Sequence, residues 1–182
     1  AGTVLVGILG GLISSTASTL TFSRMTVTRP SLAPGASVMV VIASTVVFAR
    51  VLGELAVVAW PVLPEMAPPL LVMMLAMVLI SATLYRKAGS GLKAPPPEEP
   101  PSDLKSAVIF GLLYAAVLVA VAFARMYLGD RGLYLVAFVS GLTDMDAITL
   151  SSARLVAQGD LAAGTGWRMI MVGGMSNLLF KS

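Results

Sequence analysis

The sequence predicts an all-α fold, a polytopic transmembrane helix bundle of about six spans that is built from a parallel internal repeat with broken helices at the midplane. Three observations support this prediction: the composition, the long apolar stretches, and two segments that are similar to each other. Of the 182 residues, 57% are hydrophobic and only 12% are charged, whereas a soluble domain is about 25% charged. So little charge argues against a cytosolic enzyme, a disordered tail and a nucleic-acid binder.

Six apolar stretches approach the length of about 20 residues that a membrane helix needs. They are Gly2–Ser23, Ala36–Trp60, Pro69–Tyr85, Ser106–Leu128, Gly132–Ala157 and Thr165–Phe180. Between the third and the fourth lies a proline cluster at residues 94–101, and clustered prolines cannot continue a helix. We therefore expect two halves of three spans each, residues 1–86 and 106–182, joined by a hydrophilic linker at residues 87–105.

Basic residues predict the orientation, because cytoplasmic loops of membrane proteins are enriched in Lys and Arg. With six crossing spans, one side collects Arg24, Arg29, Arg86, Lys87, Lys93, Lys105, Arg154 and Arg168, and the other collects Arg125, Arg131 and Lys181. This distribution places the linker in the cytoplasm and the residue-1 end outside. No charged segment with a cleavage site precedes the first span, so we do not expect that span to be a signal peptide.

Two segments of the chain are similar at a constant offset of 130 residues. Residues 11–24 and 141–154 share Gly, Leu, Ala, Thr, Leu and Arg at equivalent positions, and residues 44–48 resemble residues 176–180 at an offset of 132. If every span crosses the membrane, the two copies point the same way and form a parallel repeat. The repeat also predicts that one helix is missing at each end of the chain. Substrate sites of repeat-built transporters lie near the bilayer midplane, at the interface between the repeats.

Asp144 and Asp146 are the sharpest functional signal, because both fall near the middle of the fifth span. A charge at the centre of a membrane helix costs about 2.5–3.5 kcal/mol, and such residues usually line an ion or proton path. Positions i and i+2 of a regular helix point about 200° apart. Both carboxylates can therefore face one ion only if the helix is broken, and the nearby Gly141 makes such a break plausible.

Further oxygen ligands occupy equivalent places in the repeat. They are Ser14, Ser15, Thr16, Thr19, Ser44, Thr45, Thr143, Thr149, Ser176 and Asn177. The alternative for each hydroxyl is a bond to the backbone of its own helix. Carboxylate, hydroxyl and amide oxygens suit Mg²⁺, Mn²⁺, Ca²⁺, Na⁺ or H⁺, with Asp144 and Asp146 as the metal ligands. No covalent cofactor is expected.

Arg50 and Glu54 lie one helical turn apart in the second span. We interpret them as a structural ion pair near the outer interface, because neutralising two charges matters more in lipid than in water. The alternative is that the pair forms a gate.

The segments at residues 11–20, 44–50, 141–151 and 176–181 resemble the transmembrane domain that often follows an MgtC/SapB domain in bacterial inner-membrane proteins. The resemblance covers nearly the whole chain, and the Asp-x-Asp-Ala-Ile-Thr block is its most specific part. It implies a multi-pass protein of the bacterial inner membrane, associated with magnesium homeostasis or metal transport, that extends beyond both ends of this chain. The family pattern carries over to Ser14, Ser15, Thr16, Thr19, Asp144, Asp146, Ala147 and Thr149. Met145 departs from the small aliphatic residue usual there.

The function that these signals favour is membrane transport of a cation, with a hard divalent metal such as Mg²⁺ or Mn²⁺ bound at a midplane oxygen site between two repeats. One alternative is a proton- or sodium-coupled carrier of a small solute. Another is a non-transporting regulatory membrane subunit. An enzyme is not expected, because the chain has no His or Cys and its two aspartates are poorly placed for an aspartyl pair. The expected partners are the lipid bilayer, the cation and a second copy in a homodimer, with no nucleic acid.

Overall fold

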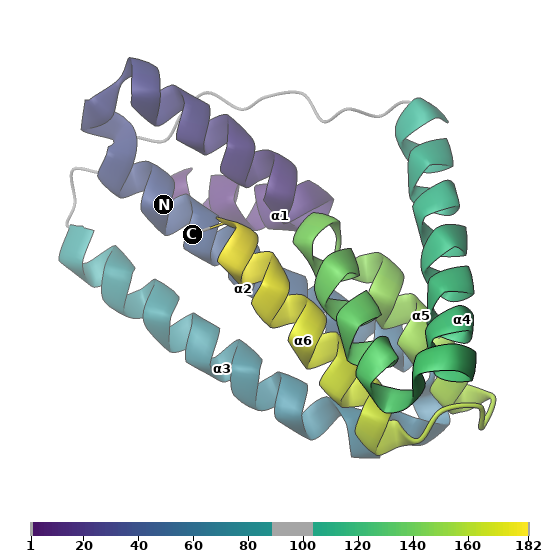
Figure 1. The fold of residues 1–182 in the computed structure, drawn as a ribbon. Coiled ribbons are helices and arrows are strands. Elements are labelled where there is room, and N and C mark those ends of the chain that lie inside the picture. The colour runs from purple at the N-terminus through teal and green to yellow at the C-terminus, as the bar shows by residue number, and fades with distance from the viewer. Residues whose placement is uncertain (1, 89–103, 182) are drawn as a thin grey trace. The chain divides into compact units, whose positions relative to one another are not determined.

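The computed structural model describes residues 2–88 and 104–181, apart from some side chains of the fourth helix, and every element in these ranges is helical (Figure 1). The elements are α1 (Gly2–Thr28), η1 (Pro30–Leu32), α2 (Ala33–Val58), η2 (Trp60–Val62), α3 (Leu63–Ala88), α4 (Leu104–Thr143), α5 (Asp146–Ala157) and α6 (Ala163–Lys181). The all-α prediction is therefore confirmed for the described part of the chain. Most of the predicted linker at 87–105 lies outside the described residues.

Three helical stretches of the described residues are long and apolar enough to cross a membrane, judged by length and composition: Gly2–Thr28, Pro30–Val58 and Trp60–Ala88. The third also exposes a row of large apolar side chains, which include Leu71, Val72, Leu75, Val78 and Leu79. A soluble protein rarely exposes so continuous an apolar surface. These helices indicate a membrane protein whose solvent is a lipid bilayer.

The chain forms two compact units. The first comprises Ala1–Arg50 and Leu71–Pro100, and the second comprises Val51–Leu70 and Pro101–Ser182. Helices α2 and α3 each contribute one end to each unit. The division into residues 1–86 and 106–182 stays a prediction.

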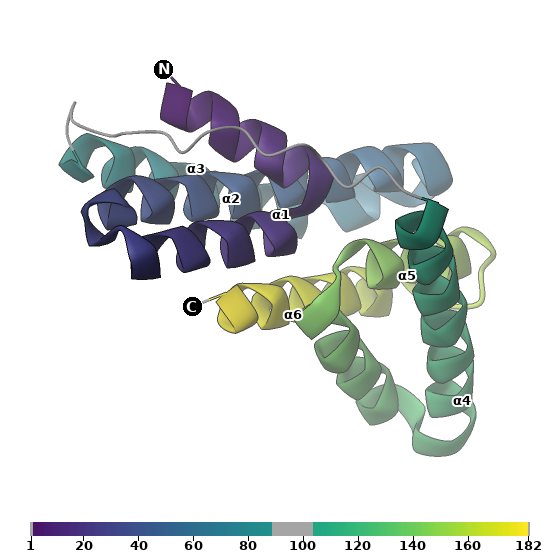
Figure 2. The same cartoon turned by 90° about the horizontal axis from the view of Figure 1, so that it is seen from above.

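In the first unit, α1 reverses direction at Ser14 instead of continuing as one straight helix. Ser14 has a non-helical backbone (φ −163°, ψ 109°), and a Cβ added at Gly10 would lie 2.5 Å from Ser18 Oγ. In a straight helix these two residues would be about 12 Å apart along the axis. Figure 2 shows the two arms of α1 running in opposite directions. The expectation that residues 2–23 form one crossing span is therefore wrong, and we call α1 the first hairpin.

The first hairpin packs along the N-terminal part of α2. A Cβ at Gly7 would lie 3.0 Å from the Ile42 side chain, and one at Gly11 would lie 2.6 Å from the carbonyl oxygen of Ala43. The first arm therefore runs parallel to α2. The second arm returns, since its Phe22 joins a small apolar core with α2 near the start of that helix. The open end of the hairpin, its base, thus lies beside the start of α2, and its turn lies beside the middle of α2.

In the second unit, α4 folds back on itself before it reaches α5. Figures 1 and 2 show its ribbon turning between an N-terminal part and a second arm, Gly132–Leu142. Side chains from both parts line one apolar groove of about 580 Å³; they include Ala116, Ala120, Phe123, Leu135 and Val136. The prediction of separate apolar segments on either side of residue 130 agrees with this course.

A second chain reversal follows at Asp144 and Met145, between α4 and α5 (Figure 1). A Cβ at Gly173 of α6 would contact Ile148 Cγ2 at 3.0 Å and the Ala137 carbonyl oxygen at 3.4 Å. A continuous helix would separate Ala137 from Ile148 by about 16 Å along its axis. The expectation that residues 132–157 form one crossing span is therefore also wrong. We call Gly132–Leu142, the turn and α5 the second hairpin.

Candidate ion site at the α4–α5 turn

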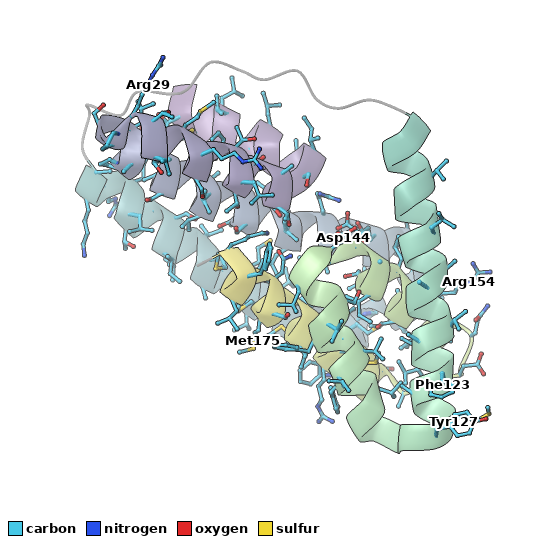
Figure 3. All side chains as sticks on the ribbon, turned by 45° about the horizontal axis from the view of Figure 1, so that its top comes forward. Arg29, Phe123, Tyr127, Asp144, Arg154 and Met175 are labelled. Atoms are coloured by element: carbon cyan, nitrogen blue, oxygen red, sulfur yellow. The ribbon has the colours of Figure 1, made fainter. Side chains whose placement is uncertain are left out.

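The second hairpin places a carboxylate at its turn. Asp144 follows the last residue of α4, and its Oδ1 accepts a hydrogen bond from the backbone N–H of Asp146 at 3.0 Å. Asp146 is the first residue of α5. Figure 3 shows Asp144 where the chain passes from one arm to the other. The break that we predicted from the i, i+2 spacing is therefore present. The Asp144 carboxylate satisfies the first backbone N–H of α5, whereas the N-cap position belongs to Met145, which makes no side-chain cap bond.

The end of the second arm is tied to α6 by side chains that donate hydrogen bonds to its carbonyl groups. The last four carbonyl groups of a helix, which here include that of Gly141, lack donors within that helix. Asn177 Nδ2 donates to the Gly141 carbonyl oxygen at 2.9 Å, and Ser176 Oγ donates to the Phe138 carbonyl oxygen at 2.6 Å. Lys181 Nζ in turn donates to Asn177 Oδ1. Two residues predicted as ion ligands, Ser176 and Asn177, thus position the turn.

Close backbone approach fixes the same junction. A Cβ at Gly141 would lie 2.2 Å from the Gly173 carbonyl oxygen and 2.6 Å from Gly173 Cα. Small residues at helix interfaces allow such contacts inside membranes. The two glycines therefore set how deeply the turn sits against α6.

Helix α5 carries buried hydroxyl groups just beyond the turn. Thr149 and Ser152 are both fully buried, and their hydroxyl oxygens have no hydrogen-bond partner in the described part of the chain. Ser151 instead donates to its own helix, at the Ala147 carbonyl oxygen. Because Asp146, Thr149 and Ser152 recur at a spacing of three residues, they occupy neighbouring positions on α5. Ser152 was not among the predicted ligands, although the Ser-Ser pair one turn after Thr149 is a signal that could have indicated it.

The site has two acidic residues, Asp144 and Asp146. Among the described residues no group of three or more His, Cys, Asp or Glu side chains is arranged to hold a metal. An ion at this turn would therefore combine the carboxylates of Asp144 and Asp146 with neutral oxygens. The side chain of Thr143, another predicted ligand, lies outside the described residues.

The turn of the first hairpin repeats this architecture with different chemistry. Ser14 Oγ accepts a hydrogen bond from the Ala17 backbone N–H at 3.2 Å, so a neutral hydroxyl caps the second arm. The Gly11 carbonyl oxygen accepts a hydrogen bond from Arg50 Nη1 at 3.2 Å. Arg50 therefore places a positive charge beside the first turn, whereas the second turn carries two carboxylates. The predicted ion pair between Arg50 and Glu54 stays a prediction.

The remaining predicted ligands lie in the first unit, where several bond to backbone groups. Thr19 Oγ1 donates to the Ser15 carbonyl oxygen at 2.8 Å. This is a bond to the backbone of its own helix, the alternative to ion binding. Thr45 Oγ1 bonds to the Val41 carbonyl oxygen and to Ser81 Oγ, each at 2.8 Å, and thereby links α2 to α3. Ser15 and Ser44 are buried, and Thr16 is half-buried.

Replacing Asn177 with leucine should destabilise the second unit while keeping the side-chain volume. The Gly141 carbonyl oxygen would lose its donor, which we expect to cost about 1–2 kcal/mol in a membrane. Thermal denaturation in detergent measures this, with Met175→Leu as control because Met175 is exposed on the same helix. Equal melting temperatures for Asn177→Leu and the wild type would show that the bond contributes nothing.

Comparisons with known proteins identify the family of this chain. A family model described as a domain of unknown function, DUF4010, matches residues 1–182. An uncharacterized protein of Aquifex aeolicus (strain VF5) is 29% identical over 185 residues, which cover 98% of this chain and 79% of the relative. No solved structure matches. The association with MgtC/SapB domains stays a prediction, because the matching descriptions do not mention it. Since the family model spans the whole sequence, the chain belongs to the DUF4010 family.

Proposed function

We propose that this protein carries a cation across a membrane, and that the ion binds at the α4–α5 turn between Asp144 and Asp146. The preferred ion is a hard divalent metal such as Mg²⁺ or Mn²⁺. The observation that carries the proposal is the presence of two carboxylates at a chain reversal inside an apolar helical unit. Irregular backbone at membrane depth is tolerated where it lines a cavity or a binding site.

Helix capping alone does not account for Asp144. A side-chain cap contributes about 1 kcal/mol, whereas a charge at the centre of a membrane costs about 2.5–3.5 kcal/mol. At the first turn the neutral Ser14 hydroxyl also accepts a bond from a backbone N–H, three residues further along the chain. A cation bound at the turn would stabilise the Asp144 carboxylate, which the single backbone hydrogen bond does not neutralise.

The depth of the turn also supports the proposal. The arms Gly132–Leu142 and Asp146–Ala157 are about 17–18 Å long at 1.5 Å per residue. This length is a little over half of the hydrocarbon core, which is about 30 Å thick. Beyond the contact of Gly141 with Gly173, the turn lies toward Asn177, in the C-terminal part of α6. Arms of this length would place a bound cation inside the hydrocarbon core, away from the surface at which the hairpin begins.

Charge balance and ligand type favour a hard divalent ion. Two carboxylates neutralise one divalent cation. The fully buried hydroxyl of Thr149 lies on α5, the helix that begins with Asp146. Mg²⁺ is commonly held by one or two carboxylates while it keeps several of its waters. The absence of Cys and His from the sequence argues against a selective Zn²⁺ or Cu⁺ site.

The equivalent placement of the two turns supports an internal repeat. The turn residues Ser14 and Asp144 are separated by the same 130 positions as the similar sequence segments, and so are the close contacts Gly11–Ala43 and Gly141–Gly173. Each unit thus contains a helix hairpin followed by a longer helix packed against it. Repeats of this kind are typical of secondary transporters.

Ion flux into proteoliposomes tests the proposed function. The reconstituted protein should take up Mg²⁺ or Mn²⁺ without a second solute, and Na⁺ and pH gradients should change the rate little. Uptake of a small solute that needs a proton or sodium gradient, without metal flux, would instead support a coupled carrier. A protein that binds no ion and carries no flux would contradict the proposal and leave a regulatory membrane subunit.

A further inference from the structure

We infer that Thr149 and Ser152 hold water molecules of the cation's hydration shell, so that the protein takes up a partly hydrated divalent ion instead of a bare one. The inference rests on the proposed function, because it describes the state of the ion that binds at the α4–α5 turn. Both residues lie on α5, and α5 and its neighbour α6 belong entirely to the second unit.

The two hydroxyl groups are buried without a protein partner. Thr149 and Ser152 have no exposed surface, and neither hydroxyl oxygen bonds to any residue that the structure describes. A hydroxyl on a helix can bond to the carbonyl group four residues earlier, and Ser151 makes this bond to Ala147. Thr149 and Ser152 make no such bond. Buried polar groups that lack a protein partner are usually bonded to ordered water.

Ser152 faces α6, which offers its hydroxyl no side-chain partner. The residues one turn before and one turn after it, Ile148 and Val156, both pack on glycines of α6. Residues one turn apart share one side of a helix, so Ser152 points in the same direction. The buried α6 residues between these glycines are Met169 and Ile170, whose side chains have no donor and no strong acceptor. The Ser152 hydroxyl therefore needs a partner that is not a side chain of α6.

The spacing of residues on α5 relates the two hydroxyls to the proposed ion. Asp146, Thr149 and Ser152 recur every three residues, so the Cβ atoms of neighbouring members are about 5–6 Å apart. Ser152 lies about 9 Å from Asp146 along the helix axis, whereas Mg²⁺ binds its oxygen ligands at about 2.0–2.1 Å. One ion cannot therefore bind both side chains directly. A water on the ion extends its reach to an oxygen up to about 4.8 Å away.

Water molecules then connect the ion to both hydroxyls. A water bound to an ion at Asp146 donates to Thr149, and a second water bridges Thr149 and Ser152. Each hydroxyl gains the partner that its own helix and α6 do not supply. Mg²⁺ gives up its waters reluctantly, so a row of oxygens that binds those waters lowers the cost of moving the ion into an apolar helical unit.

Matched substitutions on α5 of the full chain test the inference. Thr149→Val and Ser152→Ala each remove a hydroxyl that has no partner among the described residues, and valine also keeps the shape of threonine. The control is Ser151→Ala, because Ser151 is equally buried but its hydroxyl already bonds to Ala147. Isothermal titration in detergent measures the affinity for Mn²⁺, and the metal-free melting temperature reports the fold. Pulsed EPR in D₂O detects the waters that remain on the bound Mn²⁺.

We expect Thr149→Val and Ser152→Ala each to weaken Mn²⁺ binding about tenfold, as loss of an outer-shell partner of a metal does. Their metal-free melting temperatures should stay equal or rise, because an unpaired buried hydroxyl is removed. Ser151→Ala should bind Mn²⁺ as the wild type does. Wild-type affinity in both test variants, or a bound Mn²⁺ without water, would overturn this inference and leave the ion site at the turn. A wild-type protein that binds no Mn²⁺ would overturn the proposed function as well.

Discussion

Replacing Asp144 with serine should abolish high-affinity metal binding while leaving the fold intact. Serine caps the equivalent turn of the first hairpin, where Ser14 Oγ accepts from the Ala17 N–H. A serine hydroxyl at residue 144 can still accept a bond from a nearby backbone N–H, so the variant removes the charge and keeps an acceptor at the start of α5. Losing one charged partner in a buried pair costs about 3–5 kcal/mol, so we expect Mn²⁺ affinity to fall by at least about 100-fold.

The matched control for this variant is Asp160→Asn, which removes one negative charge from an exposed position outside the turn. Isothermal titration with Mn²⁺ measures the affinity, and metal-free melting temperature reports the fold. Metal binding at wild-type strength in Asp144→Ser would remove Asp144 from the site. A collapse of the metal-free melting temperature would show instead that serine does not cap this turn, and Asp144→Asn would then separate charge from capping.

Replacing Gly141 with alanine should destabilise the second unit strongly. The new methyl group would lie 2.2 Å from the Gly173 carbonyl oxygen and 2.6 Å from its Cα. These are backbone atoms, so no side-chain rotation relieves the overlap and α6 must move away. Overpacking a tight contact typically costs about 1–3 kcal/mol, and displacement of α6 would also weaken the Asn177 bond to the same residue.

Two other glycines provide internal controls for this prediction. Gly53 of α2 and Gly164 of α6 have open space where a Cβ would go. Alanine there should leave the melting temperature unchanged or raise it, because alanine is the better helix former by about 1 kcal/mol. Melting curves of the three variants in detergent test the prediction. Equal effects at Gly141 and Gly164 would contradict the packing derived for the junction.

The helices and the sites of the breaks could be predicted from the sequence, because they depend on local signals. Apolar length indicated the helices, and the spacing of Asp144 and Asp146 indicated a break beside Gly141. The shared pattern of residues 11–24 and 141–154 indicated that both breaks belong to one motif. Capping by Ser14 and Asp144 then follows from side chains that favour helix starts.

The chain reversals could not be predicted, because the hydropathy of a segment does not depend on whether its helix continues straight or folds back. An apolar stretch of 27 residues such as α1 has the same composition whether it is straight or folded at Ser14. The reversal depends on distant contacts, such as the donation from Arg50 to Gly11 and the packing of Gly141 on Gly173. The predicted orientation stays a prediction, because it depends on how many segments cross the membrane and each chain reversal changes that number.

Locating a bound ion tests the central claim most directly. Crystals of the protein grown with Mn²⁺ should show an anomalous difference peak at the α4–α5 turn, within coordination distance of an Asp144 or Asp146 carboxylate oxygen, and Asp144→Ser crystals should lack it. A strong peak elsewhere in the protein, or a turn that stays without metal at saturating Mn²⁺, would contradict the account.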